Sequence, residues 1–304
     1  MVAQKKIVAA IGNFDGVHLG HRHLLSQTSI LCDELDASLA VALFAPHPRR
    51  FFQPDSPPFL ITTPQQRDEA LRAAGVETIF ALPFDKDFAA LPPEAFVGEV
   101  LVKELGVAGV VTGVDFRFGK ARKGDVALLT TLGNAAGLSV RSAALLERPD
   151  TEKFGSSGVR AALRAGNVRA AAKQLGRLWC VRQRVIHGQK LGRTLGYPTA
   201  NMSLGEVLEP RCGIYATRAI IDGNALDGVS SFGRRPTVSK GEPLLETHIF
   251  DFDGDLYGRE IDIEFVDFLR DEEKFDSLND LKMQMAKDCD AARAILSAER
   301  TIMG

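Results

Sequence analysis

The stretch IGNFDGVHLGH, residues 11–21, contains the residues in the first half of the chain that are best suited to chemistry. An apolar run, Ile7–Ile11, predicts a short buried strand, and a helical spacing of apolar residues begins at Leu24. His18 and His21 therefore lie where a strand leads into a helix. The free N–H groups at the start of a helix favour a phosphate, and two imidazoles can stabilise the negative charge that develops on it during a reaction.

Two other interpretations of these histidines stay open at this point. One is an ordinary helix cap followed by a surface residue. The other is a metal site that includes His23, although no nearby cysteine or second histidine motif completes it. Glycines at positions 16 and 20 would let a ligand approach the backbone closely, which favours the phosphate interpretation.

The residues around the histidines carry a family resemblance. The segment GNFDGVHLGHRHLL resembles the nucleotidyltransferase signature His-x-Gly-His. Its fuller match is similar to the adenylyltransferase half of the bifunctional riboflavin kinase/FAD synthetases of bacteria. The resemblance implies that His18 and His21 are catalytic and that the residues around them bind ATP. These residues are Gly12, Asn13, Phe14, Gly16 and Gly20.

Length and composition indicate a soluble protein of two domains. The chain has 304 residues, of which 45% are hydrophobic and 25% charged, and its net charge is −2. This charge gives no sign of a nucleic-acid binder, and no apolar stretch is long enough to span a membrane. The four cysteines lie far apart, and the N-terminal apolar run is too short for a signal peptide, so we expect a cytoplasmic location. No residue pattern decides between a monomer and a homo-oligomer.

Short apolar runs alternate with helical patterns up to residue 145. The alternation predicts a Rossmann-like α/β domain with a parallel sheet, in which ligands bind beyond the carboxyl ends of the strands. His47 follows the second run, within a Pro-His-Pro segment that by itself indicates a stiff turn. Asp115, Phe116 and Arg117 follow the fourth run and offer ring surface and charge, whereas the basic residues Arg117, Lys120, Arg122 and Lys123 by themselves are consistent with a solvated surface. The family resemblance implies that these residues bind the flavin or the nucleotide. The five runs are Ile7–Ile11, Leu39–Phe44, Thr78–Leu82, Val107–Thr112 and Leu138–Leu145.

The segment SSGVR, residues 156–160, lies at the start of a further predicted helix. Ser157 is a candidate N-cap, and a capped helix with a surface arginine is the structural interpretation. In the family this segment typically reads Ser-Ser-Thr-x-x-Arg, and its hydroxyls and arginine bind ATP phosphates. Ser156, Ser157 and Arg160 match, whereas Gly158 stands where the Thr would be. A lost hydrogen bond to a charged group costs about 1.5–3 kcal/mol, so we expect adenylyl transfer to be weakened but retained.

From Trp179 onward the apolar runs are short and alternating, with Gly or Asp in the turns. This spacing predicts an antiparallel β-barrel or sandwich, and a helix from about Ser277 closes the chain. We expect the apolar stripe of that helix to pack on the barrel. The predicted domains are residues 1–177 and 178–304. The stripe is Leu278, Leu281, Met285, Cys289, Ala292 and Leu296.

A second motif, GQKLGRTLGYPTAN, occupies residues 188–201. It has the glycines, cations and hydroxyls of a phosphate-binding loop but lacks the Gly-Lys-Ser/Thr ending of a P-loop, and a glycine-rich hairpin is the structural alternative. Its Pro-Thr-Ala-Asn string resembles the signature of riboflavin kinases. The resemblance implies that Thr199 and Asn201 bind Mg²⁺ and that Gly192 and Gly196 let the loop lie against the ATP phosphates.

Two further segments agree with the kinase resemblance. Residues 231–237, SFGRRPT, resemble the family's Asn-x-Gly-x-Arg-Pro-Thr, with Ser231 in place of the Asn. Residues 246–250, ETHIF, resemble the strand that bears the catalytic Glu, which implies that Glu246 is the base. Without the resemblance, Glu246 would be interpreted as a surface carboxylate on a strand.

Together the two halves predict an α/β nucleotidyltransferase domain followed by a β-barrel riboflavin kinase domain with a C-terminal helix. The expected reactions are phosphorylation of riboflavin to FMN by ATP with Mg²⁺, and adenylylation of FMN to FAD. Three alternatives stay open: a riboflavin kinase with an impaired first domain, an adenylyltransferase acting on pantetheine phosphate or a nicotinate nucleotide, and a flavin-binding regulator without turnover. The Pro-Thr-Ala-Asn string disfavours the second, and Glu246 together with both histidines disfavours the third.

Overall fold

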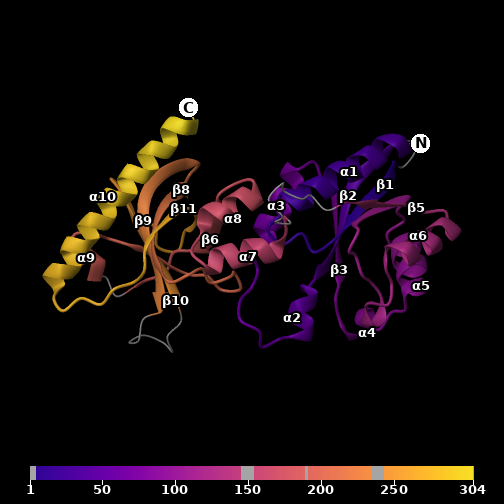
Figure 1. Cartoon of the computed structure of the whole chain (residues 1–304), viewed down its shortest axis with the longest axis horizontal. Coiled ribbons are helices and arrows are strands. Elements are labelled where there is room, and N and C mark those ends of the chain that lie inside the picture. The colour runs from indigo at the N-terminus through magenta and orange to yellow at the C-terminus, as the bar shows by residue number, and fades with distance from the viewer. Residues whose placement is uncertain (1–4, 145–153, 189–190, 235–242, 304) are drawn as a thin grey trace. The chain divides into compact units, whose positions relative to one another are not determined.

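The structure is a computed structural model that describes residues 5–144, 154–188, 191–234 and 243–303. The chain forms two compact units, and Figure 1 labels their elements. The first unit comprises Met1–Pro57 and Pro64–Gly155, and the second comprises Pro58–Thr63 and Ser156–Gly304. This division differs from the domain boundary expected between residues 177 and 178, because residues 156–177 pack within the second unit.

The first unit is an α/β domain built on a five-stranded parallel sheet. The strand order is β3-β2-β1-β4-β5, so the direction of winding reverses next to β1. All five predicted runs form strands, which confirms the α/β class. The strands are β1 (Lys6–Ile11), β2 (Ala37–Ala45), β3 (Thr78–Pro83), β4 (Gly109–Gly113) and β5 (Ser139–Ala143).

Helices cover both faces of this sheet because its central strands are apolar on both sides. Leu24 and Leu31 of α1 pack on one face, together with Val41 of β2. Phe96 and Leu101 of the π-helix η1 pack on the other face. The helices are α1 (Leu19–Leu35), α2 (Pro48–Phe52), α3 (Pro64–Ala73), α4 (Lys86–Ala89), α5 (Pro93–Ala95), η1 (Phe96–Glu104), the 3₁₀-helix η2 (Lys120–Arg122) and α6 (Val126–Ala135).

The second unit contains a six-stranded antiparallel sheet in the order β6-β11-β8-β9-β10-β7. A backbone bridge joins Ile186, just after β6, to Asn201 of β7, so the two edges meet and the sheet is a nearly closed barrel, as predicted. The short strand β7 was not predicted, because four residues after a glycine-rich loop show no clear alternation. The strands are β6 (Trp179–Arg184), β7 (Ala200–Ser203), β8 (Gly213–Ile221), β9 (Asn224–Arg234), β10 (Pro243–Ile249) and β11 (Glu260–Arg270).

The barrel core extends over two helices and over residues 58–63. Trp179 is fully buried, lies 4.6 Å from the Phe265 ring centroid and donates its indole N–H to the Ile61 carbonyl at 2.8 Å. Helices α7 (Ser156–Arg164) and α8 (Val168–Leu175) add Val159, Leu163, Val168, Ala171 and Leu175 to the same core. The segment 58–63 is therefore part of this unit, although its neighbours in the sequence belong to the first unit.

Helices α7 and α8 begin differently. The side chain of Asn167 caps α8 by accepting from the backbone N–H of Ala170 at 3.0 Å. Helix α7 already begins at Ser156, so Ser157 lies inside the first turn and is not the N-cap. The prediction of Ser157 as the cap was therefore wrong.

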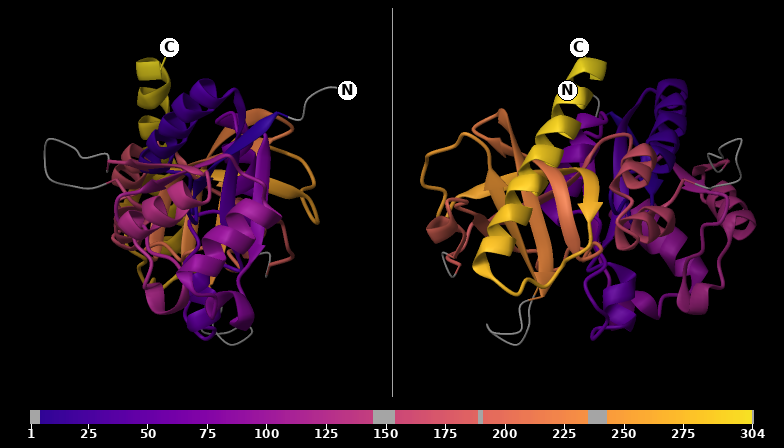
Figure 2. Two further views of the ribbon diagram at one scale, coloured as in Figure 1. Left: turned by 90° about the vertical axis from the view of Figure 1, so that its right-hand side faces the viewer. Right: turned by 60° about the vertical axis from the view of Figure 1, so that its left-hand side comes forward.

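The C-terminal helix α10 (Leu278–Met303) lies across the strands of the barrel, as the right view of Figure 2 shows. Its buried Ala292 and Leu296 pack against the outer face of the sheet. Leu281 and Met285, nearer its start, instead line a cavity. The predicted stripe therefore packs as core only along its C-terminal part. In the described part of the chain, none of the helices has the length and apolarity needed to cross a membrane.

Candidate active sites

The loop between β1 and α1 carries the histidine motif and has a constrained backbone. Phe14, Gly16 and Val17 have positive φ values of 54°, 81° and 42°. Phe14 and Val17 are fully buried, so their packing offsets the cost of the left-handed conformation. A Cβ on Gly12 would lie 3.2 Å from the Phe14 ring, which explains the glycine there. Asn13 Oδ1 is buried and has no hydrogen-bond partner among the described residues, so it can accept a donor from a ligand or a water.

His18 is the N-cap of α1. Its Nδ1 accepts a hydrogen bond from the backbone N–H of His21 at 3.3 Å, so the proton of the neutral ring lies on Nε2. The two imidazoles stack with their centroids 3.7 Å apart. A Cβ on Gly20 would lie 3.1 Å from the His18 ring, so a side chain there would press on this pair. The cap interpretation is thus correct for His18, and the cap also determines which nitrogen can donate to a ligand.

The strand order places this loop at an edge that suits ligand binding. Strand β1 lies between β2 and β4, where the winding reverses, and parallel sheets bind ligands beyond the carboxyl ends of the strands at such a point. His47 follows β2 at the same edge, caps α2 and accepts from the backbone N–H of Arg49 at 3.1 Å. His18 and His47 therefore lie in loops that follow neighbouring strands, and His21 lies in the first turn of α1.

The residues predicted after β4 have different environments. Asp115 and Arg117 are exposed, and Arg117 forms a 3.3 Å ion pair with Asp125. Phe116 is half-buried and stacks on the buried Phe118, with centroids 5.7 Å apart and ring planes 12° apart. Phe116 thus offers a ring surface at this edge, whereas Arg117 has the surroundings of a solvated charge.

A group of phenylalanines near α2 was missed by the sequence analysis. Phe84 lies at its centre, with its ring centroid 5.5–5.7 Å from those of Phe44, Phe51, Phe52 and Phe88. Phe52 is 65% exposed. Aromatic faces of this kind suit a planar ring system. The only signal in the sequence was the adjacent pair Phe51-Phe52 directly after the Pro-His-Pro turn.

The SSGVR segment begins α7 and so belongs to the second unit, whereas the histidine motif belongs to the first. Arg160 donates from Nε to the Phe59 carbonyl at 2.8 Å, and its guanidinium lies 5.6 Å from the Phe59 ring centroid. Ser156 is half-buried and Ser157 is exposed in the first turn. The arginine is therefore held by residues 58–63, a contact that no local pattern could predict.

Gly158 faces α8. A Cβ on Gly158 would lie 2.5 Å from Oε1 of the buried Gln174, so a larger residue would be directed into the contact between α7 and α8. In the pattern Ser-Ser-Thr-x-x-Arg, the residue three positions before Arg160 is Ser157, which carries a hydroxyl. Counted back from Arg160, the Thr of the pattern therefore corresponds to Ser157 and not to Gly158. The contact of Gly158 with Gln174 likewise gives no sign that this position should carry a hydroxyl for a phosphate.

Glu246 lies on β10 between two paired strands. Its Cα partners are Ser231 on β9 and Asn201 on β7, and directly opposite side chains share one face of a sheet. Its chain neighbours Leu245 and Thr247 are fully buried in the barrel, so Glu246 faces the outer side of the sheet. Strand pairing therefore brings together the predicted base and one predicted metal ligand.

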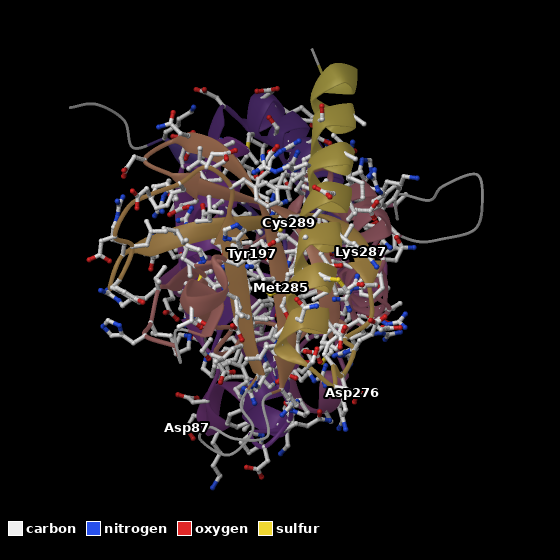
Figure 3. The ribbon with its side chains drawn as sticks, turned by 90° about the vertical axis from the view of Figure 1, so that its left-hand side faces the viewer. Asp87, Tyr197, Asp276, Met285, Lys287 and Cys289 are labelled. Atoms are coloured by element: carbon white, nitrogen blue, oxygen red, sulfur yellow. The ribbon has the colours of Figure 1, made fainter. Side chains whose placement is uncertain are left out.

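A cavity of about 580 Å³ lies along this outer face, a volume typical of small-molecule sites. Glu246 and His248 line it from β10, and Tyr197 and Thr199 line it from the loop before β7. Figure 3 labels Tyr197 together with Asp276, Met285 and Cys289 of the opposite wall. The apolar part of the lining is Leu195, Ile214, Val229, Phe275, Leu278, Leu281 and Met285.

Helix α10 forms one wall of this cavity. An ion pair fixes this wall to β11, and an uncharged thiol lies in it. Arg270 binds Asp288 through two hydrogen bonds of 2.8 and 2.7 Å, and Asp288 is buried. Burial raises the pKa of the Cys289 thiol to about 11, with a smaller contribution from the Asp288 charge. The thiol is therefore protonated at neutral pH, and it presents a soft, uncharged surface to the cavity.

A second cavity, of about 440 Å³, is lined by Val185, Pro198 and Thr247 and by the turn at residues 252–257. Thr199 lines both cavities, so the two meet at this residue. Two adjoining cavities, one of them lined by a carboxylate, can bind two substrates next to each other. This arrangement could not be read from the sequence, because the lining comes from six separated segments.

The glycine-rich loop approaches this junction. The backbone N–H of Tyr197 donates to the Gly192 carbonyl at 2.7 Å, and a Cβ on Gly192 would lie 2.3 Å from the Tyr197 carbonyl oxygen. Gly196 has a φ of 90°, which favours glycine. Both predicted glycines are thus required by the shape of the loop.

Thr199 and Asn201 offer oxygen ligands that fit Mg²⁺. The Asn201 amide nitrogen donates to the Thr199 carbonyl at 3.1 Å, and a Cβ on Gly188 would lie 2.7 Å from the amide, so the side chain is held in place. Mg²⁺ commonly binds through few protein oxygens together with water and substrate phosphates. Within the described ranges, no group of three or more His, Cys, Asp or Glu side chains could hold a metal ion, so a metal site at His18, His21 and His23 is not formed.

Comparison with known proteins agrees with both motifs. A family model described as FAD synthetase matches residues 1–157, and one described as riboflavin kinase matches residues 175–296. The chain belongs to the bifunctional riboflavin kinase/FAD synthetase family. The resemblance stated from the sequence is thereby confirmed.

Members of this family resemble the chain over nearly its whole length. The "Bifunctional riboflavin kinase/FMN adenylyltransferase" of Pseudomonas fluorescens is 40% identical over 289 residues, 95% of this chain and 92% of that protein. The protein of the same name from Haemophilus influenzae is 37% identical over 292 residues, 95% of this chain and 94% of that protein. A crystal structure described as a macrolide-efflux protein from Streptococcus pneumoniae is 30% identical, covers 96% of this chain and 95% of its own, and has a TM-score of 0.86.

Proposed function

We propose that this chain catalyses both steps of FAD synthesis. ATP phosphorylates riboflavin to FMN in the barrel unit, and AMP is then transferred from ATP to FMN, giving FAD and pyrophosphate. The observation that carries the kinase half is the meeting of two cavities at Thr199, beside Glu246. Membership of the family supports both steps.

In the kinase step, we place riboflavin in the larger cavity and ATP in the smaller one. The apolar wall from α10 suits the flavin ring, and Glu246 lies on the polar side of the same cavity. Glu246 takes the proton of the ribityl 5′-hydroxyl, and the oxygen attacks the γ-phosphorus while the bond to the β-phosphate oxygen breaks and ADP leaves. Positioning of the two substrates supplies much of the rate enhancement in such a reaction.

The hydroxyl of Thr199 and the amide oxygen of Asn201 would hold Mg²⁺ in this step. The ion neutralises charge on the ATP phosphates when it is bound. What Asn201 itself contributes is a fixed oxygen, because its amide nitrogen is engaged with the Thr199 carbonyl.

In the adenylyl step, the FMN phosphate is already a nucleophile and needs no base. It attacks the α-phosphorus of ATP, and pyrophosphate leaves. His18 Nε2–H and His21 stabilise the charge that develops on the phosphates, with the start of α1 and Asn13 at the same edge. We further propose that Ser156, Ser157 and Arg160 bind ATP phosphates, that His47, Asp115, Phe116 and Arg117 contact the flavin or nucleotide, and that Phe52 adds a ring surface.

We also propose which residues carry each activity, where the protein acts and what it binds. We assign residues 1–177 to adenylyl transfer and residues 178–304 to the kinase. The protein acts in the cytoplasm on small molecules and does not bind nucleic acid. The choice between a monomer and a homo-oligomer stays unassigned.

The test is an end-point assay of the purified protein with riboflavin, excess ATP and Mg²⁺, followed by separation of the flavins. We expect FAD. A parallel reaction that starts from FMN tests the second step alone. FMN without FAD would leave a riboflavin kinase with an inactive first domain, and bound but unconverted riboflavin would leave a flavin-binding regulator.

A further inference from the structure

His248 joins the two cavities of the barrel unit. It lies on β10 two residues after Glu246 and lines the 580 Å³ cavity. Its Nδ1 is 2.9 Å from the carbonyl oxygen of Pro198, which lines the 440 Å³ cavity. The next residue, Thr199, lines both cavities. The hydrogen bond from His248 therefore links a residue that lines the larger cavity to a residue that lines the smaller one.

The chemistry of this hydrogen bond is determined by its partner. A peptide carbonyl only accepts, so the His248 Nδ1 must carry the proton and donate it. The bond consequently needs a side-chain donor at this position of β10. A side chain of similar size without an N–H would leave the Pro198 carbonyl without this hydrogen bond.

The His248 ring is also held by its neighbours. The Tyr197 ring lies edge-on to it, with centroids 5.3 Å apart and ring planes at 78°. The buried Phe250 ring also packs against it, with centroids 5.8 Å apart and ring planes at 72°. Two consecutive residues of the loop before β7, Tyr197 and Pro198, thus contact one side chain of β10.

The contacts of His248 with Tyr197 and Pro198 are important because the same loop contains Thr199, a proposed ligand of Mg²⁺. Gly196, with a φ of 90°, precedes Tyr197, and the backbone hydrogen bond of Tyr197 goes to Gly192 within the same segment. The contacts with His248 tie this segment to β10, the strand that carries Glu246. Backbone pairing of Ala200 with Thr247 joins the start of β7 to β10, and the contacts with His248 extend this junction to Tyr197 and Pro198, next to Thr199.

We propose that His248 is a positioning residue of the kinase site. Its Nδ1–H holds the Pro198 carbonyl, and thereby Thr199, in register with Glu246, so that the phosphate of one cavity and the hydroxyl of the other are aligned. The inference rests on the proposed kinase function. A misplacement of about 1 Å at a reacting centre can lower a rate by about a hundredfold.

Two substitutions separate the hydrogen bond from the ring packing. His248→Phe keeps an aromatic ring against Tyr197 and Phe250 but removes the donor. His248→Asn removes the ring but keeps an N–H near the place of Nδ1. We expect His248→Phe to lower kcat/KM for ATP in riboflavin phosphorylation by about ten- to a hundredfold, and His248→Asn to recover at least half of that loss on a logarithmic scale.

Three readouts distinguish positioning from general damage to the fold. Riboflavin binding, measured by quenching of flavin fluorescence, should change less than about threefold, because His248 is one of many residues that line the cavity and the apolar α10 wall assigned to the flavin ring is untouched. FAD formation from FMN and ATP should stay at the wild-type rate, and the melting temperature should stay within a few degrees. The controls His23→Phe and His23→Asn, in the first unit, should leave riboflavin phosphorylation unchanged.

Each result of these experiments either supports or overturns the positioning role of His248. Equal losses for the Phe and Asn variants, or no loss for either, would overturn the proposal, as would a loss explained by weaker riboflavin binding. A wild-type protein that does not phosphorylate riboflavin would instead refute the kinase function itself, before any variant is compared.

Discussion

The two candidate active sites are built in opposite ways. The histidine motif of the first unit occupies residues 11–21, where β1 leads directly into α1. The kinase site takes Asn201 and Glu246 from paired strands and its apolar wall from α10. The histidine motif is therefore determined mainly by local structure, whereas the kinase site exists only after strands pair and a helix docks.

This difference has a consequence for how each site keeps its geometry. In the first site, buried residues with positive φ values hold a single loop in shape. In the second, a hydrogen bond between segments, that of His248 with the Pro198 carbonyl, and the backbone pairing of β7 with β10 hold the parts together. Substitutions should accordingly separate the two activities, and the following predictions test that separation from the largest expected effect to the smallest.

Glu246→Gln should lower riboflavin phosphorylation by about a thousandfold, because a general base typically contributes 10²–10⁴ in rate. FAD formation from FMN should be unchanged. The measurement is the initial rate of each step on the purified full chain. Glu260→Gln, an exposed glutamate at the start of β11, is the matched control and should leave both steps unchanged. Loss of both activities in the Glu246 variant would break the comparison between the two sites.

His21→Ala should lower FAD formation from FMN by about a hundredfold, because it removes a group that stabilises charge in the transition state. Riboflavin phosphorylation should continue at the wild-type rate, so FMN should accumulate. His23→Ala, two residues further along α1, is the control. Equal effects of His21→Ala and His23→Ala would show that the ring pair with His18 has no special role.

Riboflavin should protect Cys289 from alkylation about tenfold at saturation, because the thiol lines the larger cavity. Its pKa of about 11 means that only a small fraction is thiolate at neutral pH, so the alkylation rate should rise about tenfold per pH unit up to about pH 11. Peptide mapping by mass spectrometry gives the rate at each cysteine. The exposed Cys212 is the internal control and should not be protected. Protection of both cysteines would argue against binding in this cavity.

Gly158→Thr should lower the melting temperature by a few degrees at most, because the end of the Gln174 side chain must shift, and it should not accelerate FAD formation. The new Cβ would meet Gln174 Oε1 at 2.5 Å, and overpacking of this kind typically costs about 1–3 kcal/mol. The double variant Gly158→Thr/Gln174→Ala should recover part of the stability. Gly98→Thr, at a position where a Cβ meets nothing within 4 Å, is the matched control. Faster FAD formation in the single variant would revive the idea that Gly158 weakens this step.

Local pattern was enough for several features of this protein. Strand-length apolar runs alternating with helical spacing predicted the parallel sheet, and the histidine motif was placed correctly between β1 and α1. The Pro-Thr-Ala-Asn string pointed to a second, kinase half, in agreement with the family match to residues 175–296. These features depend on residues that are close in sequence, where periodicity, turn chemistry and short strings carry the information.

Other features could not be predicted from local sequence patterns, because they depend on which distant residues come together. The sequence suggested Glu246 and Asn201 separately, but only the register of β10 with β7 and β9 places them side by side with Ser231. The apolar stripe of α10 looked uniform, yet its first half lines a cavity and its second half is core. A periodic stripe reports that a face is buried and says nothing about whether protein or ligand covers it.

The sequence by itself determined the order of the elements, the class of each half and the residue types available for phosphate chemistry. The tertiary structure decided which of those residues meet: His248 with Pro198 across two cavities, Arg160 with Phe59, and Gly158 with Gln174. The physical reason is that these contacts depend on strand register and helix docking. Both are set by the summed burial of many distant apolar side chains, a quantity that no short stretch of sequence contains.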